Sequence, residues 1–222
     1  MSSKVKDLQP ETQQAESSQR GVLYVVSSPS GGGKGTLIRR VLDVMPDLSY
    51  SVSYTTRAPR NGEVHGREYF FVDRPKFETM VAAGEFLEWA NVHGNLYGTA
   101  EAQVINETAA GVDLVLEVDV QGADSVRKLA LDSVSIFILP PSLDTLRQRL
   151  LSRGTDTPEQ LAVRLRNAPD ELSQYEKFDY VIFNDEVERA SAQLAAIVTA
   201  ERARRSRQEA LVRDVINKFK EV

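Results

Sequence analysis

The stretch that decides the fold of this chain is Leu23-Tyr24-Val25-Val26-Ser27-Ser28-Pro29-Ser30-Gly31-Gly32-Gly33-Lys34-Gly35-Thr36. Its apolar start suits a buried strand, and the apolar residues that follow it, between 37 and 45, recur at helical spacing. A strand, a glycine-rich turn and a helix N-terminus together present backbone N–H groups and a positive dipole end to an anion. The stretch therefore predicts a cradle for nucleotide phosphates over residues 28–36, in which Lys34 reaches the β- and γ-phosphates.

Two positions depart from the usual pattern of such a loop, G-x-x-x-x-G-K-[ST]. Ser28 stands where the pattern has glycine, and Gly35 stands where it has a hydroxyl. The hydroxyl at the second position normally contacts Mg²⁺. We expect Thr36 to take its place or the metal to be held through water, and the metal ligands stay open at this point.

Composition sets limits on the class of protein. The chain has 222 residues, 41% of them hydrophobic, no cysteine and a net charge of −5. It can bury one core, forms no disulfide, and fits a reducing compartment, so we expect a cytoplasmic protein. No apolar run approaches the length of a membrane-spanning helix, and residues 1–20 are a polar segment that we expect to be a disordered tail. The acidic balance argues against broad nucleic-acid binding.

The remaining pattern alternates between strands and helices. Apolar runs at 114–118, 134–139 and 180–183 suit buried parallel strands, and a charged helix is expected from about Val187 towards the C-terminus. Further helices are predicted at 122–131, at 143–152 after Ser142, and from Thr157 onwards, where Pro169 predicts a kink or a break. This order indicates a doubly wound α/β core with a parallel sheet.

Residues 49–98 interrupt this alternation. They hold three strand-like runs, at 50–55, 69–72 and 86–92, and one short helix around residues 76–83. An insertion at this point of an α/β core is a natural place for a second substrate.

The insertion carries two arginines, Arg57 and Arg60, in a turn that Pro59 stiffens. Two planar guanidinium groups so close together can bind one phosphate, and the hydroxyl of Tyr69 can add a donor. The alternative is a pair of solvated loop arginines.

A second group contains Glu88, between apolar neighbours, and Asp119, at the end of a buried run. Buried carboxylates are costly without partners. Guanine offers two N–H donors to a carboxylate, whereas adenine offers an acceptor at N1, so the pair favours guanine. The alternatives are metal binding by Glu117 or Asp119, and a Glu88 carboxylate at a solvated edge.

A third group consists of Arg149, Arg153 and Arg164, on both sides of a flexible polar loop. Such arginines suit a lid that closes over a transferring phosphoryl group and neutralises its charge. The alternative is a charged helix face in water.

Several motifs together make the chain similar to the guanylate kinase family over about residues 20–205. They are Ser53-Tyr54-Thr55-Thr56-Arg57-Ala58-Pro59-Arg60, Gly62-Glu63-Val64-His65-Gly66-Arg67-Glu68-Tyr69, Gly94-Asn95-Leu96-Tyr97-Gly98-Thr99, Glu117-Val118-Asp119-Val120-Gln121-Gly122, Pro140-Pro141-Ser142 and Arg153-Gly154-Thr155. The resemblance implies a core at 21–48, 100–152 and 177–207, a GMP-binding region at 49–99 and a lid at 153–176. Residues 208–222 are then a C-terminal helix extension of this 21–207 domain.

The resemblance also implies roles for individual residues. Arg57, Arg60, Tyr69 and Tyr97 would hold the GMP phosphate, and Ser53, Glu88, Thr99 and Asp119 would bind the guanine. Lys34 and the amides of the loop would take the ATP phosphates, with Asn184 near the adenine. The loop residues are Ser28, Pro29, Ser30, Gly31, Gly32, Gly33, Gly35 and Thr36, of which Pro29 has no N–H to donate. Arg149, Arg153 and Arg164 would close over the transferring group, and Lys34 and Arg57 would share the catalytic work.

The activity that the resemblance implies is the Mg²⁺-dependent conversion of ATP and GMP to ADP and GDP, in purine nucleotide metabolism. Two alternatives remain, a catalytically silent binding module and a kinase for another nucleoside monophosphate. A GTPase is disfavoured, because the sequence has no Asn-Lys-x-Asp motif. The expected partners are the two nucleotides, without nucleic acid or membrane, and the oligomeric state is left open, with a homodimer as one expectation.

Overall fold

The computed structural model describes residues 20–92, 94–129, 132–152, 154 and 157–220. Arg153 and residues 1–19 of the predicted tail at 1–20 lie outside these residues. The described strands are β1 (Leu23–Ser27), β2 (Leu48–Tyr50), β3 (Tyr54–Thr55), β4 (Phe70–Phe71), β5 (Phe86–Val92), β6 (Asn95–Ala100), β7 (Asp113–Glu117), β8 (Ser133–Leu139) and β9 (Tyr180–Phe183). The described helices are α1 (Lys34–Val44), α2 (Arg74–Ala82), α3 (Glu101–Ala109), α4 (Val120–Lys128), α5 (Leu143–Ser152), α6 (Pro158–Ser173), the short 3-10 helix η1 (Gln174–Lys177), α7 (Val187–Arg202) and α8 (Arg205–Lys220).

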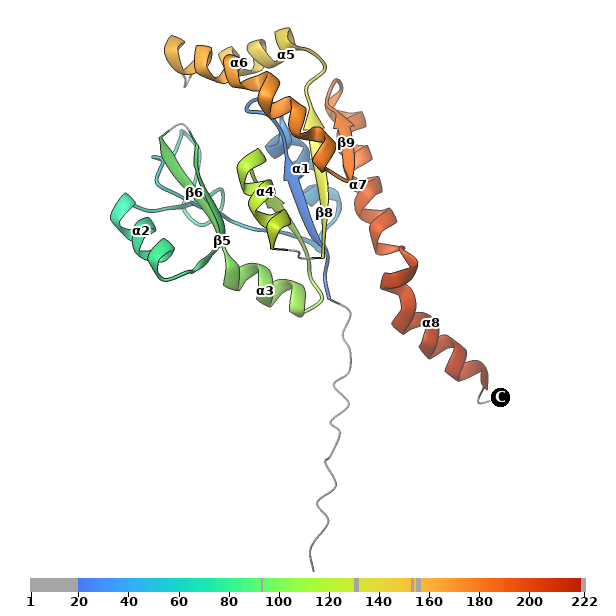
Figure 1. The fold of residues 1–222 in the computed structure, drawn as a ribbon. Helices are drawn as coiled ribbons and strands as arrows, with labels where there is room; N and C mark the ends of the chain where they lie inside the picture. Colours follow the sequence, from blue (N-terminus) through green and yellow to red (C-terminus); the bar gives the residue numbers. More distant parts are fainter. Residues whose placement is uncertain (1–19, 93, 130–131, 153, 155–156, 221–222) are drawn as a thin grey trace, which may run out of the picture.

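The core is a five-stranded parallel sheet in the order β2-β7-β1-β8-β9, with helices on both faces (Figure 1). Alternate residues of β1 point to opposite faces. Tyr24 and Val26 pack in the cluster that contains α1 and α7, whereas Leu23 and Val25 pack in the cluster that contains α3 and α4. This double burial explains the uninterrupted apolar run of β1 and confirms the predicted doubly wound α/β fold.

A second, four-stranded sheet in the order β4-β3-β6-β5 forms a separate lobe with α2 (Figure 1). β5 and β6 are an antiparallel hairpin in which Glu88 lies opposite Thr99. The predicted strand-like run at 50–55 is divided between the two sheets, because Tyr50 pairs with Val115 in the core and Tyr54 pairs with Gly98 in the lobe.

The lid helix α6 differs from the sequence expectation, because it continues through Pro169. Proline removes one N–H donor and costs a helix interior about 3 kcal/mol. Buried contacts of Ala168 with Leu146 and Leu150 of α5 hold the helix together at this point. Of the predicted kink or break at Pro169, the break is therefore wrong, and the kink stays a prediction. The start of α6 is as expected, since Thr157 and Gln160 form a reciprocal capping box.

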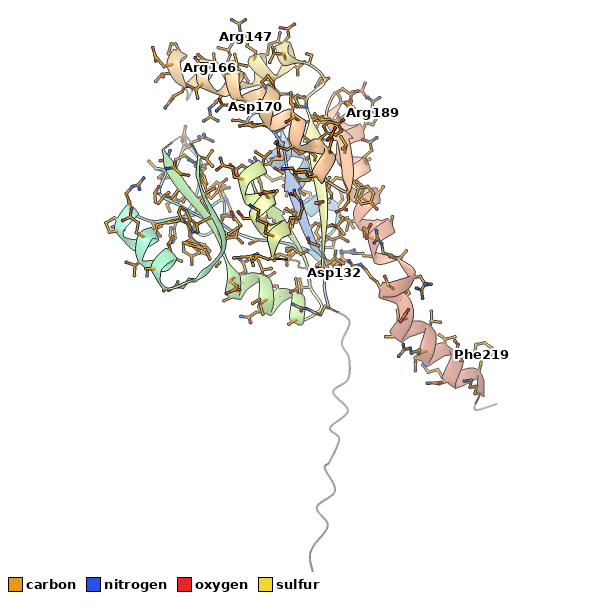
Figure 2. The ribbon with its side chains drawn as sticks, in the orientation of Figure 1. Asp132, Arg147, Arg166, Asp170, Arg189 and Phe219 are labelled. Carbon is orange, nitrogen blue, oxygen red and sulfur yellow. The ribbon has the colours of Figure 1, made fainter. Side chains whose placement is uncertain are left out.

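The single C-terminal helix expected from Val187 is two helices, α7 and α8. The chain leaves α7 at Ala203, and the side-chain amide of Gln208 donates to the carbonyl of Arg202 at 2.7 Å, which satisfies one of the free carbonyls at the end of α7. Helix α8 extends away from the body of the molecule, with Phe219 near its far end (Figures 1 and 2). Within the described part of the chain, no helix is long and apolar enough to span a membrane.

Candidate functional site

The glycine-rich loop connects β1 to α1 at the carboxyl end of the sheet. Gly31 and Gly33 have φ values of 93° and 95°, a left-handed conformation that side chains disfavour. Gly33 is the N-cap of α1, and no side chain hydrogen-bonds to this cap. The N-terminus of α1 is thus left without a side-chain cap, as an anion site requires, while the Thr36 amide donates to the Gly33 carbonyl at 3.1 Å.

Asn184, predicted to bind ATP, and Arg149, predicted to close over the transferring group, both contact the loop. The carbonyl of Gly32 accepts hydrogen bonds from Asn184 Nδ2 at 2.8 Å and from the Arg149 guanidinium at 3.2 Å. Arg149 also donates to the carbonyl of Asn184 at 2.8 Å, and burial lowers its pKa. A Cβ on Gly33 would lie 2.3 Å from Asn184 Nδ2, so only glycine fits there. Asn184 and Arg149 thus hold the shape of the loop.

The lid contacts the loop directly. The Ser30 amide donates to Glu171 Oε2 at 2.9 Å, and the guanidinium of Arg164 donates to the Ser30 hydroxyl. Both lid residues belong to α6. The sequence analysis missed Glu171, because nothing local indicates a contact across 141 residues. Helix α6, which holds most of the predicted lid, therefore contacts the loop at Ser30.

A carboxylate stands beside the loop lysine. Glu117, the last residue of β7, lies 3.7 Å from Lys34 Nζ and accepts a hydrogen bond from the Tyr50 hydroxyl at 3.2 Å. Burial, and next the charge of Glu117, raise the pKa of Tyr50. Thr36 lies exposed on the first turn of α1. Glu117 and Thr36 are thus the oxygen donors of this region that a hard divalent cation could use.

At the other end of the site, Glu88 is a buried carboxylate with only 7% of its surface exposed. The Thr99 hydroxyl donates to Glu88 Oε1 at 2.6 Å, and Ser53 Oγ lies 3.5 Å from Thr99 Oγ1. Burial raises the pKa of Glu88 to about 7, and the charge of Asp119 adds to this effect. The structure brings together the four residues that the family resemblance assigned to the guanine.

Asp119 is the N-cap of α4, and its carboxylate accepts the Gly122 amide at 2.8 Å. Because of this cap, α4 begins at Val120 and not at the expected residue 122. Gly122 is a further residue that the sequence analysis missed. A Cβ there would lie 2.8 Å from Glu88 Oε2, so the glycine makes room for the carboxylate.

Arg57 is held by a partner that the sequence analysis did not single out, Glu63. Two parallel hydrogen bonds of 2.8 and 3.0 Å join the guanidinium to this carboxylate, and the guanidinium also lies over the ring of Tyr69. Burial opposes the charge of Arg57, but the Glu63 hydrogen bonds and the neighbouring Tyr97 leave its pKa raised. An acid six residues after Arg57, within the same turn, was the available signal.

Arg60 and Tyr97 complete this group. Arg60 has an exposed side chain, and its amide donates to Glu63 at 2.7 Å. The rings of Tyr97 and Tyr69 meet edge to face at 5.9 Å. Burial raises the pKa of Tyr69, so its hydroxyl stays a hydrogen-bond donor at neutral pH.

One continuous cleft of about 930 Å³ contains both ends of the site. Lys34, Gly35 and Glu117 line it on the side of the core, and Arg57 and Glu88 line it on the side of the inserted lobe. Among the described residues, no group of three or more histidines, cysteines, aspartates or glutamates is arranged to hold a metal by itself.

The sequence model of the guanylate kinase family matches residues 20–201 of this chain. The chain belongs to the guanylate kinase family. The guanylate kinase of Geobacter sulfurreducens is 48% identical over 187 residues, which are 84% of this chain and 92% of that protein. The guanylate kinase of Dechloromonas aromatica is 49% identical over 180 residues, which are 81% of this chain and 89% of that protein.

A solved structure of the same family supports the fold. The crystal structure of guanylate kinase from Anaplasma phagocytophilum has a TM-score of 0.75 at 36% identity, covering 90% of this chain and 96% of that one. The family resemblance and the kinase class expected from the sequence motifs are confirmed by these matches. The helix α8 lies beyond the part that the family model covers.

Proposed function

We propose that this protein transfers the γ-phosphoryl group of ATP to GMP, which yields ADP and GDP. The observation that carries the proposal is the shared cleft, which joins the glycine-rich loop and Lys34 to the group of Arg57 and Glu88. Phosphoryl transfer needs two phosphates aligned and their charge neutralised. Two anion-binding ends that face one volume meet this need.

The guanine end is selective because of Glu88. An ionised carboxylate accepts the N1–H and the 2-amino group of guanine, whereas the N1 acceptor of adenine is repelled. Thr99 fixes one carboxylate oxygen, and Asp119 and Ser53 lie beside it. Because a guanine donates two hydrogen bonds to the charged form, GMP binding stabilises ionised Glu88 against its burial.

The phosphate of GMP is assigned to Arg57, Arg60, Tyr69 and Tyr97. Glu63 orients Arg57 in advance, so little side-chain entropy is lost when a phosphate binds. Arg60 is free to approach from the exposed side, and the two tyrosine hydroxyls supply further donors.

The ATP phosphates are assigned to the loop amides and Lys34, and the transferring group to Arg149, Arg153 and Arg164. Asn184 is assigned to the adenine side of the loop. In this mechanism a GMP phosphate oxygen attacks the γ-phosphorus in line with the leaving oxygen of ADP. A phosphate oxygen needs little deprotonation, so we assign no general base. The arginines and Lys34 stabilise the charge that spreads over the equatorial oxygens.

Magnesium is the cofactor that we propose, and the donor set is compatible with it. Mg²⁺ prefers oxygen ligands and keeps several waters, and Glu117 and Thr36 offer oxygens beside the loop. When bound, the ion neutralises charge on the β- and γ-phosphates. In the cell we place the reaction in the cytoplasm, where both nucleotides are available.

We also propose a homodimer in solution. The support is the apolar face of α8, where Leu211, Val212, Val215, Ile216 and Phe219 are 46–78% exposed. Pairing two such faces would bury on the order of 1,000 Å², the lower end for a specific interface. Light scattering should give twice the chain mass of 24.7 kDa, and a monomer mass at micromolar concentration would contradict the dimer.

A coupled assay of ADP release with GMP, AMP, CMP and UMP as acceptors tests the activity. We expect turnover with GMP that exceeds the turnover with each other monophosphate by at least about 10²-fold. Equal rates with AMP would contradict guanine recognition, and heat of ATP binding without turnover would indicate a silent binding module.

A further inference from the structure

Gly35 occupies a helical position where its backbone conformation does not require glycine. It is the second residue of α1 and is not among the glycines with positive φ. Glycine within a helix costs about 0.5–1 kcal/mol relative to alanine. The reason for glycine must therefore lie in what surrounds the position.

The surroundings are the carboxylate of Glu117. A Cβ on residue 35 would lie 3.3 Å from Glu117 Oε1 and 3.4 Å from Oε2. These separations are tighter than most contacts that a Cβ makes, so a side chain at 35 would force the Glu117 head group to shift by a few tenths of an ångström. The absence of a side chain is what allows the carboxylate to reach the first turn of α1.

The carboxylate cannot simply move aside. The Tyr50 hydroxyl donates to Oε2 at 3.2 Å, and Lys34 Nζ lies 3.7 Å from Oε1. Tyr50 is fixed in turn, because it belongs to β2, which pairs with β7 in the core sheet. These two contacts hold the head group, which is 17% exposed and lines the cleft.

We propose that Gly35 and Glu117 are a matched pair in which the carboxylate takes the metal-facing position that a hydroxyl side chain fills in the common form of this loop. This inference rests on the proposed function and deepens it. Glu117 binds Mg²⁺ of the Mg²⁺–ATP complex directly or through its waters, and glycine at 35 provides the space. A serine at 35 is then no additional ligand, because it pushes away the carboxylate that binds the ion.

The two explanations of Gly35 predict opposite signs for one substitution. If the loop merely lacks a hydroxyl ligand, Gly35→Ser restores it and the metal binds more tightly. If Gly35 and Glu117 are a matched pair, Gly35→Ser weakens metal binding. Gly35→Ala adds the same Cβ without a hydroxyl and isolates the steric part.

The experiment measures Mn²⁺ affinity of the full chain with the non-hydrolysable ATP analogue AMP-PNP, by the electron paramagnetic resonance signal of free Mn²⁺. We expect Gly35→Ser, Gly35→Ala and Glu117→Asp each to weaken Mn²⁺ binding by about tenfold or more. The double variant G35S/E117D should bind Mn²⁺ more tightly than either single variant, since the shorter acid leaves room for the serine. This non-additivity is the signature of direct coupling.

Tighter Mn²⁺ binding by Gly35→Ser, or additive losses in the double variant, would overturn the inference. Thermal unfolding of each variant checks the fold. Glu117→Asp introduces no crowding, so unchanged Mn²⁺ binding in that variant would also overturn it. The titration contains no GMP, so it tests the Gly35–Glu117 pair even if the acceptor is another monophosphate. Failure of GMP turnover alone would reject only the proposed function.

Discussion

The Thr99 hydroxyl donates a 2.6 Å hydrogen bond to Glu88 Oε1, and the two residues lie directly opposite each other in the β5–β6 hairpin. The bond fixes one carboxylate oxygen in a position that burial makes unfavourable for charge. A group held in this way is prepared for a ligand that donates to the other oxygen. The hairpin register thus prepares the guanine site before any ligand binds.

Glu88→Gln tests this site directly. The amide presents an N–H group to a guanine N–H, so we expect GMP affinity to fall by about 30- to 100-fold while ATP affinity stays unchanged. Calorimetric titration of both nucleotides measures the two effects. Glu85→Gln, at an exposed position just before the same strand, is the matched control. GMP affinity that survives Glu88→Gln would show that Glu88 is wrongly assigned.

GMP binding should also depend on pH. The pKa of Glu88 is about 7 in the free protein, and guanine binds the ionised form. Affinity should therefore rise by about tenfold from pH 6 to pH 8 and level off above that. In the Glu88→Gln variant, the change of GMP affinity with pH reports only the titration of the GMP phosphate itself. Equal slopes in the two proteins would exclude Glu88 as the titrating group.

The same carboxylate lowers stability at neutral and basic pH. Its pKa is raised from 4.5 to about 7, so the folded chain binds more protons than the unfolded chain between these values and loses stability as pH rises. At pH 8, Glu88→Gln should raise the free energy of unfolding by up to about 3 kcal/mol. At pH 4.5 the gain should vanish. Urea unfolding at both pH values measures this gain in the free energy of unfolding. A gain of equal size at pH 4.5 and pH 8 would show that the ionisation of Glu88 is not its cause.

Lys34→Ala should abolish most of the turnover while the fold is kept. Lys34 is the loop cation assigned to the transferring phosphates, and removing such a group costs about 10²- to 10³-fold in kcat. Lys76→Ala, in exposed α2, is the matched control. Initial rates with ATP and GMP measure the effect, alongside thermal unfolding. If Lys34→Ala kept the same kcat as the control variant, the role assigned to Lys34 in phosphoryl transfer would be wrong.

The Glu171 carboxylate accepts a hydrogen bond from the Ser30 amide. A phosphate must compete with this carboxylate for the same donor and is repelled by its charge. We therefore expect Glu171→Gln to tighten ATP binding by about three- to tenfold, an effect that salt screens. Asp170→Asn, on the neighbouring exposed residue of α6, should leave it unchanged (Figure 2). Weaker ATP binding in Glu171→Gln would mean that the contact supports the loop.

Prediction of the core from the sequence was most accurate where neighbouring residues alone determine the local structure. The run at 180–183 is β9 within its predicted bounds, and the Thr157 capping box starts α6 as expected, since both depend on neighbouring residues alone. The break predicted at Pro169 does not occur, because the contacts of α6 with α5 outweigh the cost of proline to the helix. Long-range packing of this kind leaves no local trace.

In the candidate site, too, local patterns could be recognised in the sequence and long-range contacts could not. Glu88 could be grouped with Asp119, because Glu88 lies between apolar neighbours and Asp119 ends a buried run, and the structure brings them together. Glu171 and Gly122 could not, because their partners Ser30 and Glu88 come from remote parts of the chain. The roles assigned to these side chains stay predictions until the variants above are measured.

A titration with a single molecule that joins adenosine and guanosine through five phosphates tests the central claim, that the two anion-binding ends face one cleft. The account predicts one molecule bound per chain, with an affinity at least about 10²-fold above that of ATP or GMP alone, and loss of both substrates' binding in its presence. Binding no tighter than ATP, or GMP that still binds to the saturated protein, would contradict it.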